Sequence, residues 1–445
     1  MSASSASETT ARDAANLSPG IPAAMLAALE HAALYAVSFA FPALLIRHAG
    51  MPDADAMRLI QTSFIAMGLV TFLTALKYGK LGAGLFCPAV TGPSFFSLAL
   101  LSVKEGGLAL LSGMLLTAGL IQVLVSQVLH RLRFLLSADL MGVVVLMIGI
   151  TGVTFAAPVF LGCPQPGAQI HLPTLAVAII TLLIMSLLSV RGSGLWRRYS
   201  MLIGLAAGMA LAWLFNVRAP LFTVSGTPAL FEVPFFGRAG LAFKPALLLP
   251  CALAALISAL KACACLIASR QVAGEAEAVP ARAEPISNGV LAVGLGNAFS
   301  GLAGGLGVSA SAGNVGLSLA TGVAGRRLAF VLSAGLLLLG FSPRLTSVLI
   351  SMPMPVMGAC LLYSISFMLV LAFRLLTAQT FDARKTFVLG IAITFGFCAD
   401  LLPGLFPGGH SQVTDRLNLS ILLALCLSLV FRIRARRPAE CSPGK

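Results

Sequence analysis

The stretch Leu247–Leu266 reads LLLPCALAALISALKACACL, and Lys261 is its only charged residue. A run of about 20 apolar residues is long enough to cross a bilayer as a helix. A charge deep in such a helix costs from about 2.5 kcal/mol upward, so it marks a functional or paired group by default. The next basic residue, Arg270, lies roughly 13 Å further along the helix at about 1.5 Å per residue. Lys261 is therefore too deep to extend its ammonium comfortably to the membrane surface.

The composition of the whole chain is typical of a polytopic membrane protein. Hydrophobic residues make up 58% of the 445 residues and charged residues only 10%, whereas soluble domains carry about 25% charged residues. The net charge of +14 does not indicate nucleic-acid binding, because the basic residues are spread over short loops. The nine cysteines form no CxxC pair and no Cys/His cluster with metal-ligand spacing. We therefore expect no disulfide framework, no metal site and no cofactor.

Apolar runs recur along the chain and predict an all-α polytopic membrane protein with fourteen transmembrane segments. The runs fall at 25–46, 57–76, 84–103, 108–129, 134–156, 172–190, 199–216, 245–267, 286–303, 308–322, 327–343, 350–373, 386–403 and 418–431. With both termini in the cytoplasm, 20 of the 29 Lys and Arg residues fall on the cytoplasmic side and 8 on the outer side, with Lys261 between them. This bias follows the positive-inside rule. We expect a multi-pass protein of the inner (cytoplasmic) membrane.

The polar stretches predict tails and one longer connection. Residues 1–24 begin with a Ser/Ala/Thr-rich sequence, which indicates a disordered cytoplasmic tail and lacks the order of a cleaved signal peptide. Residues 433–445 form a second cytoplasmic tail. The charged, Ala/Pro-rich stretch 270–285 is too polar to cross a membrane. No other interruption is long enough for an additional soluble domain.

Two of the apolar segments are interrupted in the same way. GLFCPAVTGPSFF (84–96) and GLGVSASAGNVGL (305–317) share the spacing G-L-x-x-x-A-x-x-G. Each is third in a set of seven segments, and an odd number of segments gives the two halves opposite orientations. Short, Gly- or Pro-interrupted segments at matching positions indicate a transporter's binding site. The alternative is that small residues here only allow helices to pack closely.

The backbone of these segments predicts a site that favours anionic ligands. Pro88 and Pro93 break a helix, and the Gly/Ser-rich stretch 304–313 is a poor helix former. Each segment should begin extended and become helical near Ser94 or Asn314. Irregular backbone at membrane depth is tolerated only where it is buried in protein or lines a cavity. Two helix N-termini meeting there would favour an anionic or acceptor-rich ligand.

At these motifs the chain resembles the nucleobase:cation symporter-2 family, which includes bacterial uracil and xanthine permeases. PAVTGPSFF (88–96) is similar to the family's third-helix segment, and GNVGLSLATGVAGRR (313–327) resembles its tenth-helix signature. MPMPVMGACLL (352–362) resembles its twelfth-helix motif. Leu29-Glu30-His31 stands where the family usually has a Gln-His pair. The similarity covers nearly all of residues 25–432.

The resemblance implies seven-plus-seven inverted repeats, with short strands in the third and tenth segments. Residues 25–130 and 244–343 would form a core domain, and residues 131–218 and 350–432 a gate domain. The substrate, a uracil-, xanthine- or urate-like base, would bind between the two domains. The family implies secondary active transport coupled to H⁺ or Na⁺, and a homodimer.

Two departures from the family pattern concern the substrate site. The helix-eight glutamate that binds the base in the family is Lys261 here, and the helix-ten Glu or Gln is Gly313. Both carboxylate or amide ligands are lost, so proton coupling cannot be carried over from the family. A lysine offers hydrogen-bond donors and a positive charge, which suit carbonyl oxygens or an anion.

The remaining site candidates follow from the motifs and from helical spacing. The backbone near Phe95 and Ala312 should bind substrate, with the ring of Phe95 or Phe96 as a stacking surface. The full set of predicted substrate-binding residues is His31, Tyr35, Ser94, Phe95, Ser258, Lys261, Ser311, Ala312, Gly313 and Asn314, with Ser309 as a further hydroxyl. His31 could equally be a packed, hydrogen-bonded residue. Glu30 is the candidate charge partner of Lys261 and would leave a neutral site.

Three functions compete on this sequence. The first is a secondary active transporter of a nucleobase or purine-like substrate of the xanthine, urate or uracil class, carried as the neutral base or as the anion (urate or deprotonated xanthine). The second is a small-anion transporter, facilitator or channel on the same scaffold, since sulfate-permease-like and prestin-like transporters share the inverted-repeat plan. An enzyme is excluded, because the sequence offers no carboxylate pair, metal cluster or nucleophile elbow.

Overall fold

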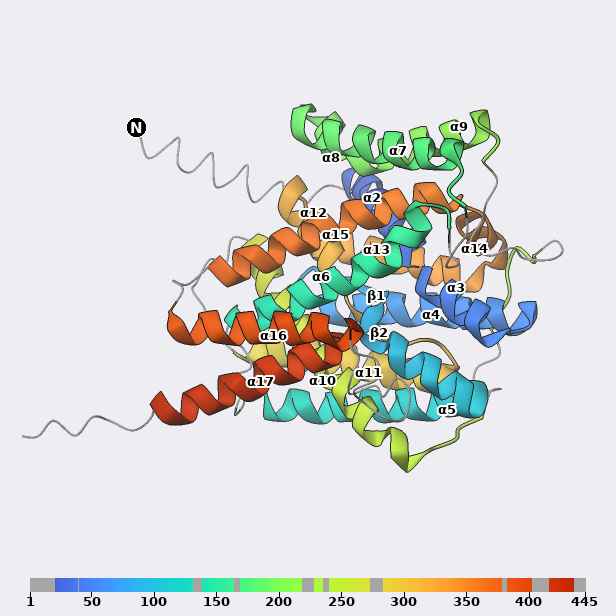
Figure 1. Cartoon of the computed structure of the whole chain (residues 1–445). Coiled ribbons are helices and arrows are strands. Elements are labelled where there is room, and N and C mark those ends of the chain that lie inside the picture. Colours follow the sequence, from blue (N-terminus) through green and yellow to red (C-terminus); the bar gives the residue numbers. More distant parts are fainter. Residues whose placement is uncertain are drawn as a thin grey trace, which may run out of the picture.

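The computed structural model describes residues 21–38, 40–129, 131, 138–163, 169–217, 228–234, 240–272, 283–377, 382–401 and 416–435. The predicted tails lie largely outside these residues, at 1–20 and 436–445, as does 273–282 of the polar connection. The structure is mostly helical (Figure 1). Its long helices run roughly alongside one another, and the two short strands lie near the middle of the bundle.

The helices before the polar connection are α2 (Ile21–Ser38), α3 (Ala40–Ala49), α4 (Asp53–Ala75), α5 (Pro93–Val128), α6 (Ala138–Phe160), α7 (Leu172–Arg191), α8 (Leu195–Arg198), α9 (Ser200–Leu214), the 3₁₀ helix η2 (Pro245–Leu247) and α10 (Leu248–Val272). After it come α11 (Ala283–Ala303), α12 (Ala312–Thr321), α13 (Arg326–Phe341), α14 (Pro343–Ile350), α15 (Met354–Thr377), α16 (Ala383–Leu401) and α17 (Arg416–Ala435).

Seven of the described helices are long and apolar enough to cross a membrane, or eight if α13 and α14, bent by 104°, form one span. This result supports a multi-pass membrane protein, while the count of fourteen stays a prediction. Several predicted segments are not continuous helices. The segment 25–46 contains two helices, and 308–322 contains a strand followed by a helix of ten residues. A test for long continuous helices does not recognise segments of this kind.

The predicted segments 84–103 and 108–129 meet at a sharp break within α5. Gly106 and Gly107 have non-helical backbone angles, and Gly107 has a φ of +66°. Glycine adopts this conformation without steric cost. On one side of the break, Glu105 pairs with Lys244 at 2.9 Å. The two glycines therefore let the chain reverse between two apolar helices.

Two short strands join the interrupted segments. Strand β1 (Ala89–Thr91) pairs antiparallel with β2 (Val308–Ala310), and Val90 lies opposite Ser309. Each strand leads almost directly into a helix, β1 into α5 and β2 into α12. Pro93 occupies the first turn of α5, where its missing N–H is no loss. The backbone thus places two helix N-termini beside one another in the middle of the bundle.

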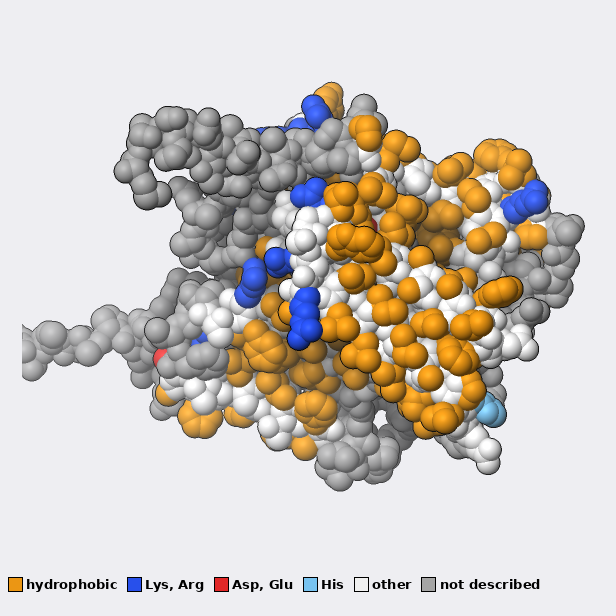
Figure 2. All heavy atoms as spheres, turned by 90° about the horizontal axis from the view of Figure 1, so that it is seen from above, with side chains coloured by type: hydrophobic (Ala, Val, Ile, Leu, Met, Phe, Trp, Pro, Cys, Tyr) orange, Lys and Arg blue, Asp and Glu red, His pale blue; other side chains and the backbone are white. Residues whose placement is uncertain are grey.

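One face of the molecule has the character expected of a lipid-exposed surface. Figure 2 shows hydrophobic side chains over most of the part of this face that is not grey, with Lys and Arg side chains in a few separate groups, one of them at the right-hand edge. On α7, exposed large apolar side chains recur at helical spacing, at Ile179, Leu183 and Leu187. Contiguous apolar surface of this kind is unusual on soluble proteins. It fits a helix that packs against acyl chains.

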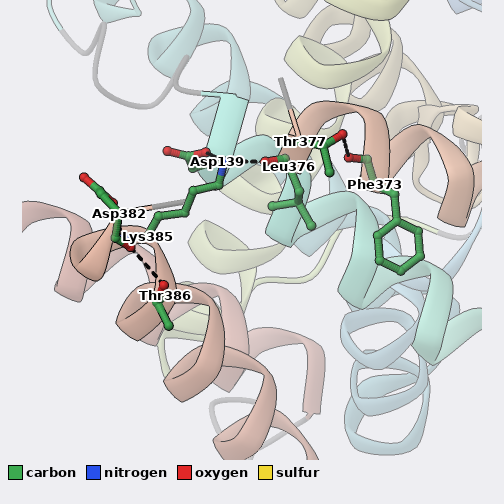
Figure 3. A network of polar contacts seen from close by, with 7 residues as sticks. All are labelled: Asp139, Phe373, Leu376, Thr377, Asp382, Lys385 and Thr386. Carbon is green, nitrogen blue, oxygen red and sulfur yellow. Dashed lines mark hydrogen bonds and ion pairs between the residues drawn. The ribbon is translucent and has the colours of Figure 1, made fainter. Parts of the chain in front are cut away.

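A buried lysine joins the ends of three helices, α6, α15 and α16 (Figure 3). Lys385 of α16 pairs with Asp139 of α6 at 2.9 Å and donates to the backbone carbonyl of Leu376 on α15. Asp382 caps the same helix, because its carboxylate accepts from the Lys385 backbone N–H at 2.7 Å. These contacts fix α6, α15 and α16 relative to each other.

Candidate substrate site

The ammonium of Lys261 lies beside strand β2, inside the protein. The Lys261 residue is only 3% exposed, and its Nζ donates to Ser309 Oγ at 3.0 Å. A Cβ built on Gly92, at the start of α5, would lie 4.0 Å from the same Nζ. Lys261 therefore sits between the two strand-to-helix junctions, at the depth where the sequence predicts the binding site.

A cavity of about 70 Å³ lies at these junctions. Its lining residues are Leu34, Phe41, Val90, Thr91, Gly92, Ile148, Gly152, Lys261, Ser311, Ala312, Gly313, Leu361, Ser364, Ile365 and Met368. They come from α2, α3, α10 and the β1–α5 and β2–α12 junctions on one side, and from α6 and α15 on the other. The cavity is therefore built where the predicted core and gate helices meet.

The lining of this cavity is electropositive and mostly apolar. Lys261 is the only charged residue among the fifteen that line it. Thr91, Ser311 and Ser364 add hydroxyl groups that can donate or accept hydrogen bonds. The N-termini of α5 and α12 add their partial positive charges. The arrangement favours a ligand with several acceptor oxygens or a negative charge and an apolar body.

Four of the predicted binding residues line the cavity: Lys261, Ser311, Ala312 and Gly313. Phe95 lines a small neighbouring cavity of about 10 Å³ together with Phe96, Thr91 and Gly92. The Phe95 side chain packs against Gly307 there. Phe96 forms an edge-to-face cluster with Phe41 and Phe155, with ring centroids 5.2–5.9 Å apart. Phe41 is thus the aromatic ring that reaches the main cavity.

His31 and Asn314 support the cavity wall. His31 Nδ1 donates to Asn314 Oδ1 at 2.8 Å, and Asn314 Nδ2 donates to Ser311 Oγ at 2.8 Å. The same Ser311 oxygen caps α12 by accepting from the Asn314 backbone N–H. A capping oxygen of this type stabilises a helix N-terminus. The chain of contacts fixes the start of α12, and His31 therefore acts on the cavity through Asn314 and Ser311.

Ser258 faces a different polar network. Its hydroxyl accepts from Gln122 Nε2 at 3.3 Å, and Gln122 Oε1 accepts from Asn297 Nδ2 at 2.9 Å. Asn297 Oδ1 in turn accepts from the Val308 backbone N–H at 2.8 Å. This network links α10, α5 and α11 to strand β2 behind the cavity. Ser258 therefore positions β2 instead of lining the cavity.

The other three predicted residues are buried outside the cavity lining. Ser94 is buried in the first turn of α5, and Tyr35 is buried beside Thr71 of α4. The Glu30 carboxyl accepts a hydrogen bond from the Met201 backbone amide, with Arg198 within electrostatic range. The ion pairs between described residues do not include one between Glu30 and Lys261. In this conformation Glu30 is directed toward α9, away from the predicted partner.

Ser364 was not predicted from the sequence. A Cβ built on Gly313 would lie 2.1 Å from Ser364 Oγ, so the Ser364 hydroxyl occupies the space where a side chain at position 313 would begin. Ser364 lies on α15, after the motif at 352–362, and nothing local marks it. Only the packing of α12 against α15 brings it to the cavity.

The model of a permease family matches residues 22–404, which is most of the chain. The chain belongs to the nucleobase:cation symporter-2 family. This result confirms the resemblance noted at the third, tenth and twelfth segments. Since members of this family are membrane transporters, the protein is a transmembrane permease and not an enzyme.

Individual relatives match along almost the whole chain. Xanthine permease XanP of Escherichia coli K12 is 27% identical over 440 residues, covering 93% of each chain. Uric acid transporter UacT of the same organism is 23% identical and covers 94% of this chain and 86% of its own. Among solved structures, the murine anion transporter Slc26a9 in its inward-facing state has a TM-score of 0.58 at 10% identity, over 93% of this chain and 68% of that one. This last likeness concerns the fold alone.

Proposed function

We propose that this permease is a secondary transporter for an oxidised purine base of the xanthine or urate class, bound as the anion. The observation that carries the proposal is the placement of Lys261, the one charged side chain among the described residues that line a cavity between two helix N-termini. The similarity to a xanthine permease and a uric acid transporter supports the same class of substrate. Uracil, which is neutral at physiological pH, should be the weaker ligand.

We propose that the chain crosses the inner membrane fourteen times as two inverted repeats of seven segments, with both termini in the cytoplasm. The antiparallel pairing of β1 with β2 supports this arrangement, because it joins the third segment of each half. Residues 25–130 and 244–343 would form the core, and residues 131–218 and 350–432 the gate. Transport would proceed by movement of the core against the gate. The homodimer implied by the family stays a prediction.

Different residues of the cavity would bind different parts of the substrate. Without substrate, the Lys261 ammonium donates one hydrogen bond to Ser309, and the bound anion would take its remaining donors. Thr91, Ser311 and Ser364 would orient the exocyclic oxygens of the base. Phe41 and the apolar residues of α15 would cover its faces. None of the described residues that line the cavity is a carboxylate, so the family's carboxylate-based proton coupling is not carried over to this site.

Thermal stabilisation of the purified protein tests the substrate class. A ligand at a hundred times its Kd raises the stability of the folded state by about 2.7 kcal/mol. Urate and xanthine should raise the melting temperature at concentrations where uracil does not. Stabilisation by sulfate, bicarbonate or chloride alone would favour the small-anion transporter. Uracil as the strongest ligand would contradict the role proposed for Lys261.

A further inference from the structure

A second and larger cavity, of about 460 Å³, lies between the predicted core and gate. Its lining residues are Ser189, Val190 and Arg197 from α7 and α8, Gly316 and Leu319 from α12, and Phe367, Val370, Leu371 and Arg374 from α15. None of the residues predicted from the sequence motifs as substrate ligands is among them. We call this cavity the arginine vestibule.

The arginine vestibule continues the substrate cavity along the same two helices. On α12, Gly313 lines the substrate cavity and Gly316, three residues later, lines the vestibule. On α15, Ser364 lines the first and Phe367 the second. Residues three apart lie on the same face of a helix. The two cavities therefore follow one another along a single α12–α15 seam.

A tight contact closes the seam between the two cavities. A Cβ built on Gly316 would lie 2.8 Å from Phe367 Cβ and 3.1 Å from the Phe367 carbonyl oxygen. The Phe367 ring packs edge-to-face on Tyr363, with centroids 4.8 Å apart. Tyr363 is in turn held by a hydrogen bond of 2.8 Å to Ser200 on α9. Phe367 is therefore supported from the gate and pressed against the core.

The charge of the vestibule matches that of the proposed substrate. Arg197 and Arg374 both line it, and none of its nine lining residues is acidic. Arg197 lies in the short helix α8 and Arg374 in the last turn of α15, two positions that the Lys/Arg distribution places on the cytoplasmic side. A cleft lined by one sign of charge raises the local concentration of the opposite ion and increases its association rate. Two guanidinium groups on the path to an anion site would act in this way.

We propose that the arginine vestibule collects anionic substrate on the cytoplasmic side of the Lys261 site, and that Phe367 against Gly316 is the barrier between them. The proposal rests on the proposed function, because it assumes that the Lys261 cavity binds an anion. It assigns Arg197 and Arg374 to the rate of substrate entry and release. It leaves the equilibrium affinity of the Lys261 site to the residues of the substrate cavity.

A charge probe tests the vestibule without any transported substrate. Leu319→Cys places a thiol in its lining, in a protein whose Cys163, Cys398, Cys426 and Cys441 are replaced by serine. Anionic and cationic methanethiosulfonate reagents of similar size are then compared. Arg197→Gln with Arg374→Gln should lower the anionic-to-cationic ratio of modification rates by roughly tenfold, within the range of electrostatic effects on association. The matched control, Lys80→Gln with Arg327→Gln, removes two exposed cations outside the lining and should leave the ratio unchanged.

Urate transport in oriented proteoliposomes is the second test of the arginine vestibule. With the vestibule facing the added urate, the double arginine variant should show an initial rate roughly three- to tenfold lower at low salt. Its rate should depend less on KCl than that of wild type, and equilibrium urate binding should change less than twofold. If the double arginine variant has the same reagent ratio as wild type, or the same urate transport rate and salt dependence, the role proposed for the arginine vestibule is wrong. If wild type neither binds nor transports urate or xanthine, the proposed function fails, whatever the reagent ratio shows.

Phe367→Ala tests the barrier in the same vesicles. Removal of the ring should increase the rate at which the anionic reagent modifies Ser364→Cys in the substrate cavity. No increase would show that Phe367 does not separate the two cavities.

Discussion

At the scale of single residues, Lys261 is a buried cation whose described contacts include one hydroxyl and no carboxylate. Removing an ammonium from water carries a penalty of several kcal/mol unless opposite charge or hydrogen bonds compensate. The helix N-termini of α5 and α12 add to the positive potential instead of offsetting it. An anionic ligand would supply this compensation.

Lys261→Met keeps the length of the side chain and removes the charge. We expect it to abolish urate binding and to leave the melting temperature unchanged or slightly higher, because a lone buried charge is removed. Lys261→Arg should restore binding only in part, since a planar guanidinium does not replace a compact ammonium. Binding of radiolabelled urate to the purified variants measures the loss and the partial recovery of affinity. Lys80→Met, at an exposed position, is the control. A Lys261→Met variant that binds and transports urate like wild type would show that the lysine is structural.

The residues of the site differ in how far the sequence could predict them. Lys261 and the stretch Ser311–Gly313 were predictable, because a charge in an apolar run and a helix start after a Gly/Ser-rich stretch are local signals. Ser258 precedes Lys261 by one turn on the same helix, yet Gln122 of α5 and Asn297 of α11 form the network it faces. Ser364 and Phe41 come from elements that only the tertiary packing brings to the cavity. Local patterns carry no information about such partners.

At the scale of elements, the α12–α15 contact depends on two glycines that face α15. Gly313 lies against the Ser364 hydroxyl, a small group at the end of a side chain, whereas Gly316 lies against Phe367 Cβ and its backbone. A hydroxyl can rotate away from an added methyl group, but a backbone cannot. The sequence predicted the break before α12 from its Gly/Ser content. Close helix packing by the small residues of this segment is the alternative interpretation that the sequence leaves open, and α15 as the helix they contact was not predicted.

Gly316→Ala should therefore separate α12 from α15. The added Cβ would lie 2.8 Å from Phe367 Cβ, so the helices must move apart. We expect a loss of about 1–3 kcal/mol in stability, as for other overpacked sites, and a lower rate of urate transport. Gly335→Ala on α13 is the matched control, because a Cβ there meets no atom within 4 Å. It should be neutral or slightly stabilising, since alanine favours a helix over glycine by up to about 1 kcal/mol. The melting temperatures and initial transport rates of the two variants test this prediction. If Gly316→Ala and Gly335→Ala have the same melting temperature and transport rate, the close contact between α12 and α15 is contradicted.

At the scale of the whole molecule, the substrate cavity lies on the boundary between two groups of helices. The β1–β2 pair, α10 and α12 provide the charged and hydrogen-bonding side, and α6 and α15 provide a mostly apolar side with Ser364. Each group has its own internal ties: the Gln122–Asn297 network behind β2, and the Lys385 contacts at the ends of α6, α15 and α16. Few polar contacts need to break if one group moves against the other. This division favours transport by rigid movement of core against gate.

A disulfide across the boundary tests this movement directly. A Cβ built on Gly313 lies 3.5 Å from Ser364 Cβ, within the range of about 3.5–4.5 Å that a disulfide requires. We expect the Gly313→Cys/Ser364→Cys protein to lose urate transport on oxidation and to regain the transport of its reduced form with dithiothreitol. A second pair, Met185→Cys/Gly204→Cys, joins α7 to α9 within the gate; its Cβ separation of 3.3 Å is slightly below that range. Its oxidation should leave transport at the reduced level, because both helices belong to the same moving group. If mass spectrometry shows the 313–364 bond formed while transport continues, core and gate do not separate along α12 and α15.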